Sequence, residues 1–485
     1  MKGVELLVLG LYFLACVAIA WWTARRAGAG QASYWAADRA IGVWVNGFGT
    51  FSTLVSAASF LGFLGMTCRW GWSLTAIALG VGPTLGFVLS MLLVSGPLRR
   101  YSERRGKFTL SSFLSDRFGG ATGTAGTVLI ILIFSAYIVP QLIGGGLVAE
   151  YVLGIERRLA ILLVGAVFIA YVLAGGMLSV TWTDFMQGIL MFALMVGLAA
   201  VAFLQFGGPG PLVARAVETR AHFLDLDPSL SAWTYLGFPL GIMIFVLSAP
   251  HTIMRLFTAK NVRQGRLALS LTAGLCLVFH LVGYLGVAAA TLALRPDHRD
   301  FDKTYVVAMN ELFPAVGRGL GVAAILAAIM STTAGLLLTA GAEFTMNVYR
   351  RFVRPGAGEA EGIRVGRWAM LAIGAISVVL ALVETRGIGE IVGQLVSAVG
   401  SAFAVPLVAG IWWKRATSVG GLVSLLGGFV TFIAVHLAGI VGLFGEILIS
   451  LPVSIAGMVL GSLLSGPPKP EQVEFVEGLH RASAD

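Results

Sequence analysis

Three consecutive hydroxyl residues, Ser331, Thr332 and Thr333, lie in the middle of a long uncharged segment and are the first candidates for chemistry. The segment 319–342 carries no charge, and it is long enough to cross the hydrocarbon core of a bilayer. Polar groups at that depth face a cavity or another helix rather than lipid. Their neutral oxygens suit a small, weakly held alkali cation. The alternative is that they only bond to backbone carbonyls within or between helices.

The composition of the whole chain places these residues in a membrane protein. Hydrophobic residues make up 57% of the sequence and charged residues 12%, and the mean hydropathy is +0.89. These values exclude a soluble enzyme and predict an all-α polytopic membrane protein without a separate soluble domain. The net charge of +9 is assigned to basic loops at one membrane face, so no nucleic-acid partner is expected. The cysteines have neither disulfide nor zinc-site spacing and are interpreted as packing residues: Cys16, Cys68 and Cys276.

Uncharged runs of about 17–25 residues are the units of membrane spans. Thirteen are predicted: one leading span, ten core spans and two trailing spans. Their ranges are 4–24, 42–68, 73–97, 126–152, 158–175, 181–205, 233–256, 267–293, 317–347, 366–384, 388–412, 418–441 and 446–465. With the N-terminus outside, about two thirds of the Lys and Arg residues fall in cytoplasmic segments, which favours this orientation. We therefore expect a multi-pass protein of the cell membrane with a cytoplasmic C-terminus.

Two core spans carry small residues or proline at matching places. Core span one has the run 56–59 (SAAS) followed by Gly62 and Gly65, and core span six has the run 248–251 (SAPH). These spans stand five apart, and paired interruptions at such an interval indicate an inverted-repeat transporter. For either site alone, a simple kink or packing position is the alternative.

The inverted repeat predicts how the chain is divided. The expected segments are 1–40 (leading helix and cytoplasmic loop), 41–206 (first repeat, core spans one to five), 207–232 (external loop), 233–415 (second repeat, core spans six to ten), 416–466 (two trailing helices) and 467–485 (cytoplasmic tail).

Four stretches of the chain are similar to the sodium:solute symporter family. They are 175–187 (GGMLSVTWTDFMQ), 250–257 (PHTIMRLF), 327–333 (AAIMSTT) and 410–415 (GIWWKR). The resemblance implies the five-plus-five inverted repeat of leucine-transporter-like proteins. It also implies sodium-coupled symport of a small organic solute by alternating access. Such a protein is not an enzyme and needs no cofactor beyond the sodium ion.

In that family one sodium ion lies between core spans one and eight, and the resemblance carries its ligands onto five residues of this chain. They are the backbone carbonyls of Ser52, Val55 and Ala328 and the hydroxyls of Ser331 and Thr332. The spacing of Ala328 and Thr332 agrees with this set, because residues four apart lie on the same face of a helix.

Asp184 is the next candidate, at the cytoplasmic start of core span five. The resemblance implies that it lies near the inner side of the sodium site, where a carboxylate would draw in and release the cation. The alternative is a cap at the N-terminus of the helix. Arg255 is interpreted as an end anchor or an ion-pair partner, and the role of His251 is left open.

The resemblance places the solute midway through the membrane, beside the interruption in core span one. The stretch 241–247 (GIMIFVL) in core span six is apolar, which argues against a sugar because each unpaired hydroxyl is costly to bury. The candidate solute contacts are Ser56, Ala57, Ser59, Phe60, Gln141, Phe245 and Ser248.

The solute itself is predicted from local resemblance. The run 56–62 (SAASFLG) resembles the acetate permease branch, and 137–144 (YIVPQLIG) resembles that branch and the pantothenate branch. A short monocarboxylate such as acetate is therefore the main expectation. The hydroxyl triplet 331–333 is closer to the proline and pantothenate branches, so sodium-coupled pantothenate or proline transport is the alternative. A proton-coupled transporter or a channel is the weaker alternative. A channel would need a filter-like loop, and none is visible in the sequence. Stoichiometry, proton substitution and oligomeric state are left open.

Overall fold

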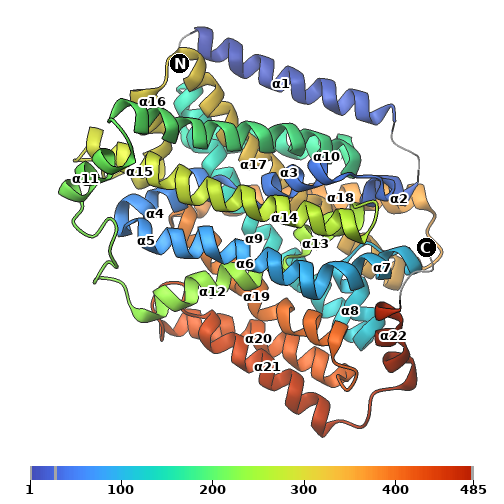
Figure 1. Ribbon diagram of the computed structural model, residues 1–485. Helices are drawn as coiled ribbons and strands as arrows, with labels where there is room; N and C mark the ends of the chain where they lie inside the picture. Colours follow the sequence, from blue (N-terminus) through green and yellow to red (C-terminus); the bar gives the residue numbers. More distant parts are fainter. Residues whose placement is uncertain (1–2, 27–29, 482–485) are drawn as a thin grey trace.

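Nearly every described residue belongs to a helix. The computed structural model describes residues 3–26 and 30–481, and within these ranges it contains no β-strand. Among the described residues, eleven helices are long and apolar enough to cross a membrane, and one bent helix pair raises the number to twelve. The long helices run in roughly one direction and pack side by side (Figure 1). The predicted all-α membrane architecture is confirmed.

The membrane helices and the shorter elements follow one another along the chain. The first half of the bundle contains α1 (Gly3–Ala24), α3 (Val43–Leu54), η2 (Ala58–Gly62), α4 (Phe63–Trp70), α5 (Trp72–Thr75), η3 (Ala76–Val81), α6 (Gly82–Leu89), η4 (Ser90–Val94), α7 (Ser95–Arg105), α9 (Gly120–Leu153) and α10 (Arg157–Gln205). The second half contains α12 (Ala232–Ser248), α13 (Pro250–Thr258), α14 (Val262–Val278), η5 (Phe279–Gly283), α15 (Tyr284–Leu294), α17 (Ala315–Phe344), η7 (Thr345–Val353), α18 (Glu359–Val383), α19 (Ile388–Trp412), α20 (Ser418–Ala438) and α21 (Ile447–Leu464). Short helices lie at the ends: α2 (Gln31–Ala36), η1 (Ala37–Arg39), α8 (Leu110–Phe118), α11 (Pro209–Thr219), η6 (Phe301–Lys303), α16 (Thr304–Leu312) and α22 (Pro470–His480).

Twelve of the thirteen predicted spans coincide with these candidate membrane helices. The remaining one, 158–175, is the first arm of α10, which bends at Gly176 with φ 63° and ψ −179°. A Cβ at this position would lie 2.9 Å from the Tyr34 ring. The glycine therefore allows both the left-handed backbone and the close approach of α2.

Core spans one and six are interrupted where the sequence predicts it. In core span one, α3 ends at Leu54 and Val55 is extended (φ −75°, ψ 111°), so that the two arms meet at an angle of 65°. In core span six, α12 ends before Ala249, which is extended (φ −62°, ψ 120°), and α13 begins at Pro250. Proline has no backbone N–H, so the helix loses a hydrogen bond at this point.

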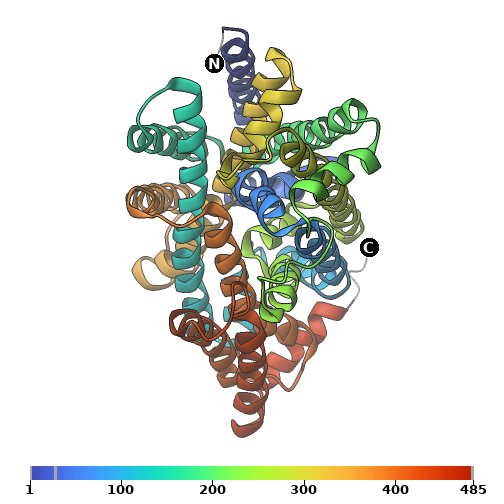
Figure 2. The same cartoon turned by 90° about the vertical axis from the view of Figure 1, so that its left-hand side faces the viewer.

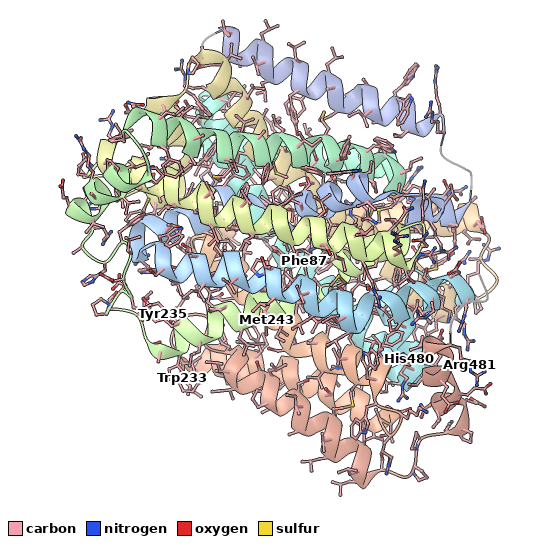
Figure 3. The ribbon with its side chains drawn as sticks, viewed as in Figure 1. Phe87, Trp233, Tyr235, Met243, His480 and Arg481 are labelled. Carbon is pink, nitrogen blue, oxygen red and sulfur yellow. The ribbon has the colours of Figure 1, made fainter. Side chains whose placement is uncertain are left out.

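The positions of the termini and of the outermost helices define the two ends and the two edges of the bundle. The N- and C-terminal ends lie at opposite ends of the helices (Figure 1). Helix α1 lies at one edge, and α20 and α21 pack together at the other edge in both views (Figure 2). Trp233 and Tyr235 mark the end of the bundle where α12 begins, whereas His480 and Arg481 of the tail lie at the opposite end (Figure 3).

Helix α17, which carries the hydroxyl triplet, crosses the centre of the bundle and is buried almost throughout its length. It packs against α1, α3, α9 and α10. Small residues permit this approach: a Cβ on Gly335 would lie 2.5 Å from Thr53 Cγ2 of α3. The triplet is therefore held directly beside the interruption in core span one.

We expect Gly62→Ala to destabilise the protein by about 1–3 kcal/mol, because overpacking forces the surrounding backbone apart. A Cβ on Gly62 would lie 2.6 Å from the Cα of Gly389 in α19, with no flexible side chain to yield. Gly274→Ala is the matched control, since nothing lies within 4 Å of its added Cβ. Melting temperatures of the purified variants test this expectation. Equal values for Gly62→Ala and the wild type would contradict the packing described here.

Candidate functional site

The interruption in core span one changes the partners of four backbone N–H groups. In a continuous α-helix the N–H groups of residues 56–59 would donate to the carbonyls of residues 52–55. Here Ser56 N–H donates to Ser59 Oγ at 3.3 Å, and Ala58 N–H donates to Ser56 Oγ at 3.2 Å. Ala57 N–H donates to Gln141 Oε1 of α9 at 2.9 Å. Ser59 N–H donates to the Ser56 carbonyl at 3.0 Å. The carbonyls of residues 52–55 are thereby left without their helical donors.

Two hydroxyls of α17 donate to these carbonyls instead. Ser331 Oγ donates to the Ser52 carbonyl at 2.8 Å. Thr332 Oγ1 donates to the Thr53 carbonyl at 3.1 Å and lies 3.4 Å from the Val55 carbonyl. The two hydroxyl side chains are almost completely buried. Core spans one and eight are therefore joined through oxygen atoms in the middle of the bundle.

A further carbonyl completes this group of oxygens. Ser331 Oγ also lies 3.2 Å from the Ala328 carbonyl on its own helix. The structure thus brings together the five residues that the sequence predicts as sodium ligands. It adds Thr53, which is not among the predicted ligands and which only its position next to Ser52 could have indicated. We call these atoms the oxygen cluster: the carbonyls of Ser52, Thr53, Val55 and Ala328 and the hydroxyls of Ser331 and Thr332.

The oxygen cluster contains only neutral donors. Among residues 3–26 and 30–481, no group of three His, Cys, Asp or Glu side chains is placed to hold a metal ion. Carbonyl and hydroxyl oxygens without formal charge can replace the hydration shell of a small cation. Thr333 points elsewhere, since successive side chains turn by about 100° around a helix, and its buried hydroxyl has no hydrogen-bond partner in the part of the chain that the structure describes.

Asp184 lies close to the oxygen cluster but forms an ion pair. Its carboxylate pairs with the Arg255 guanidinium of α13 and accepts a hydrogen bond from Thr53 Oγ1 at 3.2 Å. Arg255 also donates to the hydroxyls of Thr181 and Thr53, each at 2.8 Å. Asp184 lies eight residues beyond the bend at Gly176 and well inside α10. The alternative interpretation as an N-terminal helix cap is therefore wrong.

The predicted solute residues of core span one mostly cap the second arm of that span. The hydroxyls of Ser56 and Ser59 and the side-chain carbonyl of Gln141 accept its first N–H groups. The Gln141 amide nitrogen, Nε2, is buried and has no hydrogen-bond partner among the described residues. Tyr284 OH donates to the Ser59 carbonyl at 2.5 Å, a contact that no sequence pattern indicates. Gln141 therefore retains an unused amide donor.

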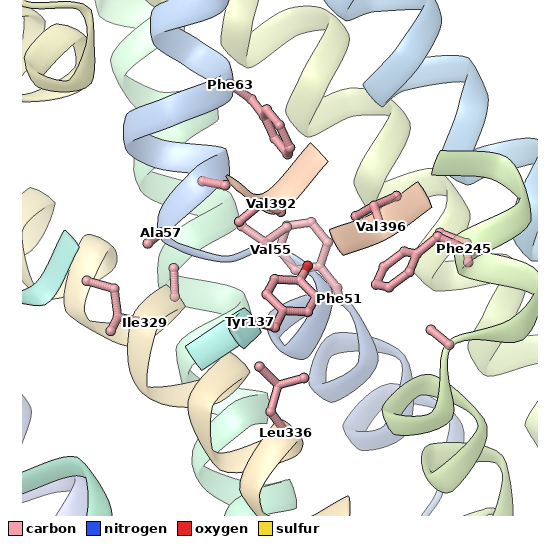
Figure 4. Packing of buried hydrophobic residues seen from close by; sticks show 14 of the residues in the cluster. Phe51, Val55, Ala57, Phe63, Tyr137, Phe245, Ile329, Leu336, Val392 and Val396 are labelled. Carbon is pink, nitrogen blue, oxygen red and sulfur yellow. The ribbon is translucent and has the colours of Figure 1, made fainter. Parts of the chain in front are cut away.

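An aromatic wall faces the interruption from the neighbouring helices. The ring centroids of Tyr137 and Phe245 are 6.1 Å apart, and those of Phe245 and His251 are 5.6 Å apart. Figure 4 shows Tyr137, Phe245 and Val396 near Val55. Phe245 gives this wall the apolar face that the sequence of core span six predicts, whereas Tyr137 contributes a hydroxyl and His251 a ring nitrogen, Nδ1, without a hydrogen-bond partner among the described residues.

Two predicted solute residues are not part of this arrangement. Phe60 packs against Phe279 and Tyr305, with centroid distances of 5.6 Å and 4.9 Å, in a separate aromatic cluster. Ser248 Oγ donates to the Ile244 carbonyl of its own helix at 2.8 Å. Both side chains are satisfied by internal packing or back-bonding, and the structure does not bring them to the other predicted solute contacts.

Comparison with known proteins gives the family. The model of the sodium:solute symporter family matches residues 34–428. The osmoregulated proline transporter OpuE of Bacillus subtilis is 29% identical over 443 residues, covering 89% of this chain and 88% of the relative. The high-affinity proline transporter PutP of the same organism is 29% identical over 412 residues, covering 82% and 85%. The sodium/proline symporter of Haemophilus influenzae is 28% identical over 409 residues, covering 80% of each chain.

Two solved structures share the fold. A Na⁺-coupled sialic acid symporter in a substrate-bound outward-open state aligns with 96% of this chain and 99% of its own, with a TM-score of 0.83 and 18% identity. MHP1, a nucleobase-cation-symport-1 family transporter in a closed conformation, aligns with 92% and 98%, with a TM-score of 0.59 and 13% identity. The predicted leucine-transporter-like fold is confirmed.

These findings also correct one expectation. The three relatives above are proline transporters, so the comparisons do not support the acetate permease branch in particular. Members of the matched family are transporters rather than enzymes, and its name implies sodium as the coupling ion. Because the family match covers most of the chain, the protein belongs to the sodium:solute symporter family.

Proposed function

We propose that the protein is a sodium-coupled symporter that carries a small amino acid, proline first among the candidates, into the cell. The observation that carries this proposal is the oxygen cluster between α3 and α17, a neutral cation site at the interruption of core span one. The choice of proline rests on the named relatives together with the chemistry of the neighbouring wall.

The sodium ion would lie within the oxygen cluster. Serine and threonine hydroxyls have lone pairs as well as a proton, so Ser331 and Thr332 can turn their protons away from the carbonyls when a cation arrives. The same oxygens would then serve as ligands of the ion. Asp184, neutralised by Arg255, would stabilise the adjacent Thr53 rather than bind sodium directly.

The solute would lie on the other side of the interruption. Its carboxylate would accept from Gln141 Nε2, the unused buried donor. A secondary ammonium needs an acceptor, and the Val246 carbonyl is available because Pro250, four residues on, has no N–H to donate to it. The apolar ring of proline would contact Tyr137 and Phe245.

A short monocarboxylate such as acetate is the second candidate, and pantothenate is a third. The run 56–62 favours them through its resemblance to the acetate permease branch. An acid without an ammonium group would use the Gln141 amide but leave the Val246 carbonyl unpaired. This difference favours the amino acid, because an unpaired buried acceptor is costly.

Alternating access would use the two interrupted spans. The arms of core spans one and six can change their angle at Val55 and Ala249, which are already extended. We place the N-terminal end outside and the C-terminal end in the cytoplasm, with the chain in the cell membrane and the segment boundaries as the sequence predicts. The opposite positions of the two ends in the bundle agree with termini on opposite sides of the membrane (Figure 1), and the distribution of Lys and Arg favours this direction.

In proteoliposomes, we expect an inward sodium gradient to drive uptake of labelled L-proline. The physical reason is that sodium fills the oxygen cluster and fixes the interruption to which the solute binds. Unlabelled proline should compete, whereas glucose should not, since the side chains of 241–247 in core span six offer no hydrogen bonds to its hydroxyls. Equal uptake with choline in place of sodium, at fixed pH, would rule out sodium coupling. Competition by acetate or pantothenate without competition by proline would select the alternative solutes.

Ser331→Ala and Thr332→Ala should each raise the sodium concentration for half-maximal uptake by about tenfold or more, because a contact to a charged group is worth roughly 1.5–3 kcal/mol. Thr333→Ala is the matched control, since its hydroxyl is outside the oxygen cluster, and its effect should be much smaller. Uptake measured against sodium concentration gives the result. If all three variants match the wild type while expressing normally, the ion binds elsewhere.

Asp184→Ala and Arg255→Ala should each destabilise the protein by about 3–5 kcal/mol, because each leaves a buried charge without its partner. The double variant Asp184→Asn/Arg255→Gln, which removes both charges, should recover much of this loss. Glu384→Ala is the control: its pair with Arg386 is partly exposed, and such pairs contribute at most about 1 kcal/mol. Melting temperatures distinguish these cases, and a double variant less stable than either single variant would contradict the ion pair.

A further inference from the structure

A second site lies far from the oxygen cluster, at the end of the bundle where the C-terminus is found. Four elements enclose a pocket of about 450 Å³ there: α2, the loop after α7, α8 and η7. Helices α2, α7 and α8 gather at this end (Figure 1). Its lining includes three basic side chains, Lys107, Arg350 and Arg351, and no acidic one.

Two of these cations lack a counter-ion. Lys107 Nζ pairs with Asp116 of α8 at 2.6 Å. Arg350 and Arg351, in contrast, form no ion pair within 4 Å anywhere in residues 3–26 and 30–481. Arg351 donates to Ser115 Oγ at 3.1 Å, and the buried Arg350 Nε has no hydrogen-bond partner among the described residues. The lining of the pocket therefore has an excess of positive charge.

The floor of the pocket is polar and buried. Ser112 Oγ donates to Asn347 Oδ1 at 2.9 Å, and both side chains line the pocket while being more than nine-tenths buried. Asn347 Nδ2 donates to Glu343 beneath the floor at 2.8 Å. The Glu343 carboxylate is already satisfied, because Ser111 N–H and Thr127 Oγ1 also donate to it. Glu343 therefore supports the floor and is not itself exposed to a ligand.

We propose that this pocket binds a phosphate ester, presented either by an anionic phospholipid headgroup or by a soluble molecule. Guanidinium groups match phosphate oxygens with paired hydrogen bonds, and the hydroxyls of Ser112 and Ser115 can add further donors. Next to Arg351, Phe352 and Val353 are 61% and 64% exposed. Basic residues beside exposed apolar ones suit the boundary between headgroups and acyl chains.

Occupation of the pocket would act on the helix that carries the oxygen cluster. Segment η7 continues directly from α17, and α8 forms the opposite wall. Helix α8 also holds the end of α19, because Arg117 donates to the carbonyls of Gly410, Trp413 and Ala416, each at 3.0 Å. A bound phosphate would thus join α17, α8 and α19 at this end and stabilise their present arrangement.

The test uses the purified full-length protein and its melting temperature. The probes are the potassium salts of sn-glycerol 3-phosphate and inorganic phosphate, together with phosphatidylglycerol, and the controls are potassium chloride of equal ionic strength and phosphatidylcholine. We expect a higher melting temperature with at least one phosphate probe. Arg350→Gln/Arg351→Gln should raise the half-effective probe concentration by about tenfold or more, since contacts to a charged group are lost. Arg354→Gln is the matched control, because Arg354 directly follows η7, lies outside the pocket and pairs with Glu361.

The outcomes separate the two sources of phosphate. A response to phosphatidylglycerol alone assigns a lipid headgroup, a response to the soluble probes alone assigns a soluble ester, and a response to both supports the shared chemistry. Lys107→Gln gives a second, milder variant if the double variant does not fold. No response of the wild type beyond the controls, or equal weakening by Arg354→Gln, would overturn the proposal. None of these results depends on which solute is transported.

Discussion

Four backbone carbonyls in the middle of the bundle, those of residues 52–55, lack their helical N–H donors. The contacts between core span one and its neighbouring helices depend on this feature. An unpaired polar group away from water costs roughly 1–3 kcal/mol. The turn 56–59 and Gln141 keep the former donors occupied, and α17 supplies hydroxyls to the carbonyls. A hydroxyl is both donor and acceptor. Each hydroxyl carries a single proton, so Ser331 and Thr332 can satisfy only two of these carbonyls at a time. In the proposed function, a cation would be shared by the atoms of the oxygen cluster.

In the proposed function, the same interruption would connect the ion with the solute. Gln141 holds the Ala57 N–H on one side of the turn, and the Val55 carbonyl faces Thr332 on the other side. Ala57 and Val55 are two residues apart, so a ligand that fixes the backbone at one of them also restricts the backbone at the other. Coupling of this kind is reciprocal: if sodium strengthens solute binding, the solute strengthens sodium binding by the same factor. A symporter of the proposed type requires this relation, and it follows here from one short stretch of chain.

The sequence predicts those features that depend on residue type at a fixed spacing. Serine, glycine and proline in core spans one and six predict the interruptions, and the hydroxyl triplet predicts the side chains that face them. Side-chain direction is not predictable in this way. Phe60 and Ser248 have suitable residue types, but the first packs against Phe279 and the second bonds to its own helix. The contact of Thr53 with both α17 and Asp184 depends on how the helices pack, which no local pattern encodes.

Three buried charged side chains of the described residues are held by an ion pair or by several hydrogen bonds. Asp184 is paired with Arg255, Glu343 accepts three hydrogen bonds, and Arg117 donates to three carbonyls. The oxygen cluster, in contrast, consists of neutral atoms only. A cation placed there would be held by dipoles without a full counter-charge, so its binding would be weaker than in an all-carboxylate site. Weak binding is what a coupling ion requires, because the ion must leave the site in every transport cycle. In the proposed function, the pairing of Asp184 with Arg255 would keep the carboxylate charge from strengthening cation binding in the oxygen cluster.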